Sequence, residues 1–294
     1  QVGSTIKPFI YTFAVDHLGI SPCTPVPNSP VSVDGWSPKE SGRVEQNGEL
    51  HPLWWGLAKS RNNYSAWIIK QSNYQAVADL INSFGVSSYI EPVPSMCLGT
   101  ADISLYEMVS AYSTFANLGI HTSPLFITRI EDKHGNTLAS FSTTTTEPIS
   151  EQSAYTVLSM MQKVTDYGGT GARLRSIYRI TGEVGGKTGT TQSGSDGWFI
   201  AVTPKLAAGA WVGGEDRSIH LFRSAEGSRL ALPIVGSFLR SVYDNPSLGI
   251  SESERFVRPV GAAPLDCHDD FTQGEANDDG WNFPTTEDEA DFFE

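Results

Sequence analysis

The pattern of apolar positions changes along the chain from a helical period to a strand-like one. In the first part, Phe9, Ile10 and Phe13 keep to one side of a predicted helix over residues 5–18, and Gly19 stands where a C-terminal cap belongs. The same reasoning predicts four further helices, over residues 54–71, 73–84, 102–117 and 150–166.

Strand-like runs begin after residue 179. Three short runs divided by Gly, Pro and Lys are predicted to be antiparallel strands: 185–191, 197–203 and 206–213. A last helix over residues 229–243 is expected to be interrupted by Pro233. Helices first and adjacent strands later predict an α+β fold, in which helices cover one antiparallel sheet.

Two local signals mark boundaries in the helical part. Ser104 and Glu107 have the spacing of a capping box near the start of the 102–117 helix. Residues 20–52 are rich in Pro, Ser and Gly, so a long excursion loop is predicted between the first two helices.

Composition excludes several classes of protein. The 294 residues are 39% apolar and carry a formal net charge of −13, which is globular but too poor in basic charge for a nucleic-acid binder. The longest apolar stretches, such as residues 206–212, fall well short of the ~20 residues that span a bilayer.

Negative charge gathers at the C-terminus. Residues 251–294 hold thirteen acidic residues against two basic ones, Arg255 and Arg258. A segment with so few aliphatic residues lacks the apolar surface to offset its ordering entropy. We therefore predict a folded domain over residues 1–245 and an acidic, disordered, solvated tail over residues 246–294.

No metal site is predicted. Cys23, Cys97 and Cys267 lie far apart and form no CxxC pair, and the six histidines form no HExxH motif. The sequence leaves open a disulfide between Cys23 and Cys97.

The first candidate for chemistry is the tetrad Ser4-Thr5-Ile6-Lys7. A three-residue separation places Ser4 and Lys7 on the same face of a helix, and Pro8 puts them at its N-terminus. The positive end of the helix dipole there favours an alkoxide on Ser4 and the neutral amine of Lys7. Lowering the lysine pKa from about 10.4 to near 7 takes roughly 4 kcal/mol, which burial and a second positive charge can supply. Taken alone, the tetrad fits an exposed polar surface better than a catalytic pair.

Two more polar groups occur further along. Ser60 and Asn62 stand two residues apart, so they share no regular helix face, and joint action requires a turn between helices. Residues 185–191 read GGKTGTT, which departs from a phosphate-binding GxxxxGK[ST] loop because Thr181 stands where the first glycine belongs. As an edge strand, this segment offers one charge and two hydroxyls for a carboxylate, from Lys187, Thr188 and Thr190.

The chain contains three short motifs in a fixed order: Ser4-x-x-Lys7, Ser60-x-Asn62 and Lys187-Thr188-Gly189. Together they resemble the signature of penicillin-binding proteins and serine β-lactamases. Flanking residues are similar to the transpeptidase domain of class A penicillin-binding proteins, over about residues 2–244: 3–9, 98–100, 111–117, 196–199 and 203–204. The resemblance implies an antiparallel sheet covered by helices plus a helical subdomain.

The resemblance also implies a role for each motif residue. Ser4 would be the acylated nucleophile and Lys7 the general base that takes its proton. Ser60 would relay a proton toward the leaving amine, and Asn62 would bind the backbone amide of the substrate.

The third motif and the residue after it would hold the rest of the substrate. Lys187 would supply positive potential that also helps to keep Lys7 neutral, and Thr188 and Thr190 would hold the terminal carboxylate. Gly189 would let the ligand backbone approach closely. Backbone N–H groups of Ser4 and Thr190 would form the oxyanion hole.

The implied activity is acyl transfer on peptidoglycan stem peptides that end in D-Ala-D-Ala, with β-lactams as covalent inhibitors of Ser4 and with no cofactor. The implied location is the periplasmic face of the inner membrane in a bacterial cell envelope. Membrane contact would be made only through an N-terminal anchor, which we expect to be absent from this chain.

Family members also place a glycosyltransferase domain and part of the transpeptidase sheet before the first motif. Because only residues 1–3 precede Ser4, we expect a chain that is incomplete at its N-terminus. We also expect residues 1–294 alone to be labelled poorly by penicillin.

Two alternatives stay open. A serine β-lactamase would need a further base to hydrolyse the acyl-enzyme, and the nearest candidate is Glu91-Pro92, which is followed by Val93-Pro94 and not by Leu-Asn. A non-catalytic fragment that binds β-lactams or serves as a scaffold is the other.

Overall fold

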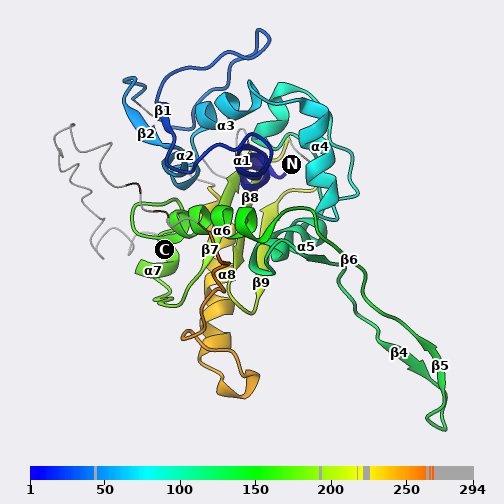
Figure 1. Cartoon of the computed structure of the whole chain (residues 1–294). Helices are drawn as coiled ribbons and strands as arrows, with labels where there is room; N and C mark the ends of the chain where they lie inside the picture. Colours follow the sequence, from blue (N-terminus) through cyan, green and yellow to red (C-terminus); the bar gives the residue numbers. More distant parts are fainter. Residues whose placement is uncertain are drawn as a thin grey trace.

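A three-stranded antiparallel sheet lies at the centre of the protein (Figure 1). The computed structural model describes residues 1–42, 45–191, 194–216, 218–220, 226–262, 265 and 267. The sheet contains β7 (Gly185–Thr190), β8 (Asp196–Val202) and β9 (Ala207–Gly213), in the order β7-β8-β9. This confirms the predicted meander.

The middle strand β8 separates two hydrophobic cores. Trp198, Ile200 and Val202 pack into the larger one, while Phe199 and Ala201 point into the other. Successive side chains of a strand point to opposite faces, so burial of all seven residues of β8 requires both faces to be covered. This confirms the α+β prediction.

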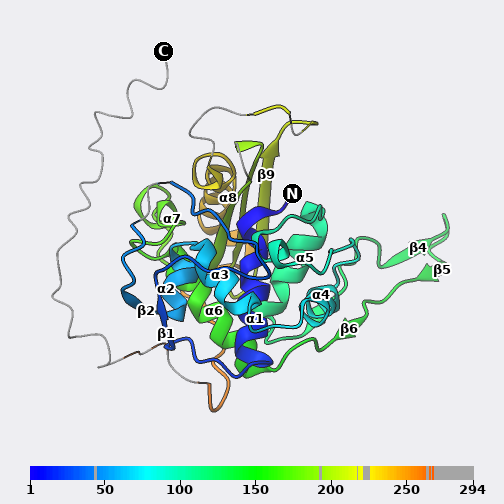
Figure 2. The same cartoon turned by 90° about the horizontal axis from the view of Figure 1, so that it is seen from above.

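Helices cover the sheet on both faces (Figure 2). The larger core contains α1 (Lys7–Asp16), α5 (Leu105–Ala116) and α6 (Glu151–Thr165). The smaller core contains α7 (Arg173–Ser176), a short helix not predicted from the sequence, and α8 (Gly227–Tyr243). The predicted interruption at Pro233 is wrong, because α8 continues through that residue.

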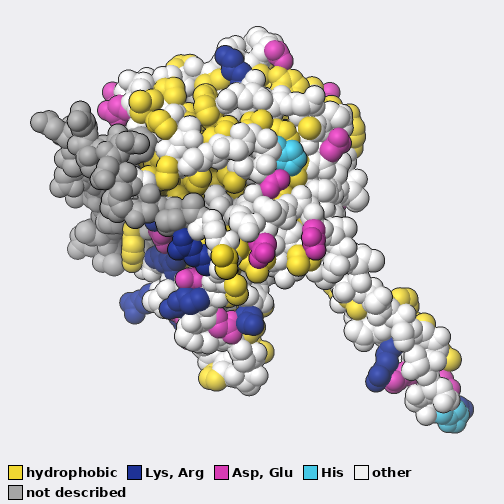
Figure 3. All heavy atoms as spheres, viewed as in Figure 1, with side chains coloured by type: hydrophobic (Ala, Val, Ile, Leu, Met, Phe, Trp, Pro, Cys, Tyr) yellow, Lys and Arg dark blue, Asp and Glu magenta, His cyan; other side chains and the backbone are white. Residues whose placement is uncertain are grey.

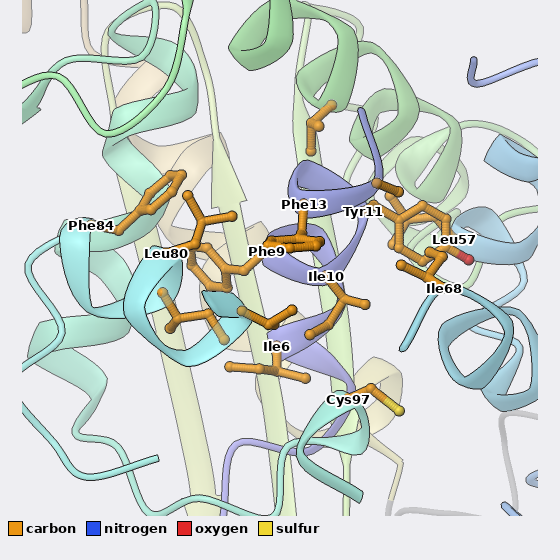
Figure 4. Packing of buried hydrophobic residues seen from close by; sticks show 14 of the residues in the cluster. Ile6, Phe9, Ile10, Tyr11, Phe13, Leu57, Ile68, Leu80, Phe84 and Cys97 are labelled. Carbon is orange, nitrogen blue, oxygen red and sulfur yellow. The ribbon is translucent and has the colours of Figure 1, made fainter. Parts of the chain in front are cut away.

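Helix α1 is buried on all sides and not on one face. All of its residues from Lys7 to Ala14 are buried. Phe9 contacts Phe84 edge to face, with ring centroids 5.1 Å apart, and Figure 4 shows its neighbours Ile10 and Phe13 in the same core. The helix that begins at Lys7 of the first motif is therefore enclosed by the larger core on all sides.

The single helix predicted over residues 54–71 is wrong. The structure has α2 (Leu53–Ala58) and α3 (Asn62–Ile69), separated by a turn in which Ser60 has a φ of +56°. The next helix, α4 (Tyr74–Ser83), and the capping box of α5 are present as predicted. A short 3-10 helix, η2 (Pro94–Leu98), precedes α5.

In the part of the chain that the structure describes, six small strands lie outside the predicted elements. Within the long loop, β1 (Pro25–Pro27) pairs with β2 (Leu50–Pro52). Two further strands, β4 (Arg129–Glu131) and β5 (Thr137–Ser140), form a ribbon that extends far from the body, with charged and histidine side chains at its tip (Figure 3). At the base of the ribbon, β3 (His121–Thr122) pairs with β6 (Thr145–Thr146).

The segment after α8 packs on the body for some distance, including a 3-10 helix, η4 (Pro246–Leu248). Glu252 accepts a hydrogen bond of 2.6 Å from Arg240 and contacts the Thr181 hydroxyl. Phe256 N donates to the Glu183 carboxylate at 2.7 Å. The predicted solvated tail is therefore wrong for its first residues, and residues 268–294 lie outside the described part of the chain.

Cys23 is bonded to Cys267, 244 residues away, so the pairing with Cys97 that the sequence left open does not occur. Cys97 is a buried free thiol whose pKa is raised to about 12 by burial. Among the helices that the structure describes, none combines the length and apolar character needed to cross a bilayer.

Candidate active site

The first motif occupies the start of α1. Gly3–Ile6 form the 3-10 helix η1, which runs directly into α1 at Lys7, with Pro8 in its first turn, where a missing N–H is tolerated. Ser4 is partly exposed, whereas the Lys7 side chain is 0% exposed. The serine can therefore meet a ligand while the amine three residues later is removed from water.

The turn between α2 and α3 brings the second motif onto Lys7. Lys7 Nζ donates to the Ser60 carbonyl oxygen at 2.5 Å and to Asn62 Oδ1 at 2.7 Å, and it lies 3.4 Å from Ser60 Oγ. The left-handed φ of Ser60 costs energy for a residue with a Cβ. It provides the turn that allows residues 60 and 62 to face the same amine.

The third motif lies on β7 and reaches the same turn from the opposite side. Lys187 Nζ donates to Ser60 Oγ at 2.8 Å and to the Thr188 carbonyl oxygen at 2.9 Å, and this side chain is also 0% exposed. Ser60 Oγ thus lies between the two lysines. Residues 4–7, 60–62 and 187–190 converge on one site.

Two glycines allow η1 to lie directly on β7. Gly3 has a φ of +53°, and a Cβ on it would lie 2.9 Å from the Thr190 carbonyl oxygen. A Cβ on Gly189 would lie 2.8 Å from the Val2 carbonyl oxygen. Side chains at either position would separate the backbones next to Ser4 and Thr190.

Burial dominates the electrostatics of both lysines. It lowers the pKa of Lys7 from 10.5 to about 8; Glu40 and Cys97 act to raise this pKa, and Arg61 acts to lower it. Burial lowers the pKa of Lys187 well below its usual value, and the charge of Lys7 acts in the same direction. The expected effect of Lys187 on the protonation of Lys7 stays a prediction.

Sequence reasoning missed two groups that contact the motifs. Thr170, in the loop between α6 and α7, places its Oγ1 2.7 Å from Thr188 Oγ1. The Lys39 carbonyl oxygen, in the long loop, accepts a 2.6 Å hydrogen bond from Asn62 Nδ2. Neither group belongs to a motif, so only the fold reveals them.

Comparisons with known proteins agree with this arrangement. Residues 1–214 match the family described as the penicillin binding protein transpeptidase domain. Penicillin-binding protein 1A of Rickettsia conorii is 30% identical over 279 residues, covering 84% of this chain and 34% of the relative. Penicillin-binding protein 1A of Aquifex aeolicus is 30% identical over 283 residues, covering 93% of this chain and 38% of that relative.

Solved structures give the same result. Penicillin-binding protein 1A from Haemophilus influenzae superposes with a TM-score of 0.75 at 26% identity, over 84% of this chain and 42% of that chain. PonA1 from Mycobacterium tuberculosis, in complex with penicillin V, superposes with a TM-score of 0.71 at 26% identity, over 89% of this chain and 73% of that chain.

The chain belongs to the family of penicillin-binding protein transpeptidase domains. Within that family, it resembles the class A proteins of the 1A type. It spans about a third of the length of the two curated relatives.

Proposed function

We propose that this chain carries a serine D,D-transpeptidase that crosslinks peptidoglycan stem peptides through an acyl-enzyme on Ser4. The donor would be a peptide that ends in D-Ala-D-Ala. One observation carries the proposal: a buried amine, Lys7, follows Ser4 by three residues and has acceptors for two hydrogens.

The hydrogen bonds of Lys7 suit a proton acceptor. A neutral amine has two hydrogens and one lone pair, and the Ser60 carbonyl and Asn62 Oδ1 accept two hydrogens at 2.5 and 2.7 Å. The lone pair then remains for the Ser4 hydroxyl. With a pKa of about 8, roughly a tenth of the molecules carry neutral Lys7 at pH 7. A positioned base of this kind increases the reaction rate by about 10²–10⁴-fold.

In acylation, Ser4 Oγ gives its proton to Lys7 and bonds to the carbonyl carbon of the penultimate D-Ala. The bond from that carbon to the terminal D-Ala nitrogen then breaks as Ser60 gives its proton to the leaving amine and takes the proton held by Lys7, 3.4 Å from Ser60 Oγ. In the second half, an acceptor amine attacks the ester carbon and gives its proton to Ser60, which passes one to Lys7. Lys7 then returns a proton to Ser4 Oγ as the ester bond breaks, so the enzyme is restored with neutral Lys7.

The substrate carboxylate would lie along β7. Thr190 Oγ1 accepts a 3.0 Å hydrogen bond from Gly227 N, so its own hydrogen is free to donate to a carboxylate. Lys187, when protonated, would supply positive potential nearby, and Thr188 would offer a second hydroxyl. The backbone N–H groups of Ser4 and Thr190 would receive the oxyanion, each worth about 10²–10³-fold.

Two finer points belong to the same proposal. A β-lactam would acylate Ser4 as the substrate does, and the similarity to PonA1 bound to penicillin V supports this. The peptidoglycan substrate favours a location on the outer side of the bacterial inner membrane, within the cell envelope.

The test is labelling with a fluorescent penicillin, followed by mass spectrometry of the labelled peptide. We expect the label on Ser4 alone, even where labelling is weak, and none in Ser4→Ala. A donor peptide ending in D-Ala-D-Ala should release D-Ala with the same dependence on Ser4. Labelling of a different serine would disprove the assignment.

The lifetime of the adduct separates the transpeptidase from the two alternatives. Glu91, the tempting deacylation base, is exposed, so we expect the adduct to persist for many minutes. Catalytic release of penicilloic acid would instead indicate a β-lactamase. Stoichiometric labelling without D-Ala release would indicate a β-lactam-binding fragment.

A further inference from the structure

Two neighbouring residues of the long loop contact the start of α3. The Lys39 carbonyl oxygen accepts a 2.6 Å hydrogen bond from Asn62 Nδ2, and Glu40 Oε1 accepts a 2.8 Å hydrogen bond from Asn63 N. Both bonds join residues 23 positions apart in sequence. The loop therefore binds the segment that presents Asn62 to Lys7.

This loop is fixed to the helical part of the protein at other points. Tyr64 OH donates to the Val26 carbonyl oxygen at 2.9 Å, and Tyr74 OH donates to Asp34 Oδ2 at 2.6 Å. Because Tyr64 lies on α3 and Tyr74 on α4, the loop is attached to two helices ahead of residues 39 and 40.

The contacts determine which way the Asn62 amide points. Its oxygen accepts from Lys7 Nζ at 2.7 Å, while its nitrogen donates to Lys39. Rotating the amide by 180° would place its oxygen against the Lys39 carbonyl and its nitrogen against an amine, which loses both hydrogen bonds. The amide is thus held at both ends.

Glu40 completes the start of α3. The residue at the N-cap, Arg61, makes no side-chain hydrogen bond to the helix, so the Glu40 carboxylate satisfies an N–H that would otherwise lack a partner. A negative group at this end also suits the helix dipole. Loss of the carboxylate should loosen the first turn, which contains Asn62.

Glu40 also acts on the amine by its charge. The charged and titratable groups that face Lys7 are Glu40 from the loop, Arg61 from the turn, Cys97 from η2 and Lys187 from β7. Among these groups, Glu40 raises the Lys7 pKa most, against the effect of burial.

We propose that Glu40 is a positioning residue for acylation at Ser4, because its carboxylate fixes Asn62 through the backbone of Asn63. Its negative charge also acts on Lys7 across the site. The inference rests on the proposed function, because it assigns Glu40 a part in the same reaction. Glu40 acts through its neighbours and does not touch the reacting atoms.

The test compares Glu40→Gln, which keeps an acceptor oxygen and loses the charge, with Glu40→Ala, which loses both. Glu45→Gln, on an exposed part of the same loop, is the matched control. The measurement is the second-order rate constant of penicillin acylation from pH 6 to 10, using the full chain, with thermal melting to check folding.

We expect the plateau rate of Glu40→Ala to fall about 10- to 100-fold, as for a displaced catalytic group. Glu40→Gln should keep the plateau within about threefold, because it retains the acceptor. In both variants the acid limb of the pH–rate profile, where the acylation rate rises with pH, should move to lower pH, since removal of a negative charge lowers the Lys7 pKa. The control should match the wild type in both respects.

The outcomes separate this inference from the proposed function. If wild-type protein is not acylated at Ser4, the proposed function is wrong. If Ser4 is acylated but Glu40→Ala keeps the wild-type plateau and acid limb, only the role of Glu40 is wrong. An equal loss of plateau rate in both variants would also contradict the role of Glu40. If Glu40→Ala does not fold, the Glu40→Gln variant decides: a pH–rate profile that is not shifted at its acidic side would overturn the proposal.

Discussion

Lys187 Nζ donates a 2.8 Å hydrogen bond to Ser60 Oγ across 127 residues of sequence. Lys7 Nζ lies 3.4 Å from the same oxygen. A hydroxyl has two acceptor positions and one hydrogen, so with ammonium or amine donors on the oxygen, the hydrogen is directed elsewhere. Ser60 is therefore arranged to give a proton to a third group, which suits a relay to a leaving amine.

Replacing Ser60 by Ala or by Gly separates this chemistry from the strain of the turn. Both changes remove the hydroxyl, so both should slow acylation by about 10²-fold. Only Gly relieves the left-handed φ of +56°, so Ser60→Gly should be more stable than Ser60→Ala by about 1 kcal/mol. Acylation kinetics and melting curves of the two variants give both quantities.

Arg179 offers a control for that comparison. It is exposed and has a similar φ of +52°. Arg179→Gly should raise the melting temperature by a few degrees and leave acylation unchanged. Equal stability of Ser60→Gly and Ser60→Ala would show that the turn stores no strain.

The pH dependence of acylation should follow Lys7. Below its pKa of about 8 the amine is protonated and cannot take the Ser4 proton, so the rate should rise tenfold per pH unit below 8 and level off above it. Lys7→Ala should lower the rate by at least about 10²-fold and keep a cooperative melting transition. A rate independent of pH between 6 and 9 would exclude Lys7 as the base.

Much of this arrangement was predictable because local rules agreed with the fold. The strands of the meander alternate clearly with turn residues, and Lys7 begins a helix and Lys187 lies on an edge strand, as the sequence suggested. The break at Ser60 was not predictable from periodicity, because apolar residues continue on both sides of it. Only contact with Lys7 and Lys187 explains why a serine adopts a left-handed backbone there.

Contacts between distant segments account for the other differences. Nothing in the composition of the long loop indicates that Lys39 and Glu40 reach α3. Cys267 lies in an acidic segment predicted to be solvated, yet it is bonded to Cys23. Propensity and charge describe a segment by itself, whereas these contacts depend on partners about 20 to more than 200 residues away.

Thr170 should affect substrate affinity more than the acylation step. Its hydroxyl lies 2.7 Å from that of Thr188, which is only 7% exposed, so the pair fixes the hydrogen that Thr188 presents to a carboxylate. Thr170→Val should raise the KM for a D-Ala-D-Ala donor about 5- to 10-fold, from the loss of a hydrogen bond worth about 1 kcal/mol. The value of kcat should change little.

Thr170→Ser is the matched variant, since it keeps the hydroxyl and removes only a methyl group. It should return KM to near the wild-type value. A KM that rises equally in both variants would point to packing of the methyl group and not to the hydroxyl pair.

The disulfide between Cys23 and Cys267 should stabilise the protein without affecting its chemistry. It closes a loop of 244 residues and fastens the C-terminal segment beside α2, because the carbonyls of Pro22 and Thr24 accept hydrogen bonds from the start of that helix. A loop of this size makes the disulfide worth about 2–5 kcal/mol. Reduction or Cys267→Ser should lower the melting temperature by about 5–15 °C.

Acylation at 25 °C should be the same in the oxidised and reduced protein, because the motif residues are held by α1, the turn at Ser60 and β7 and not by the C-terminal segment. Calorimetry with and without dithiothreitol measures the loss of melting temperature. In Cys267→Ser, the reductant should leave the melting temperature unchanged. If reduction leaves the melting temperature of the wild type unchanged, the bond is absent or the segment it holds adds no stability. If reduction slows acylation at 25 °C, then the C-terminal segment supports the position of the active-site turn through α2.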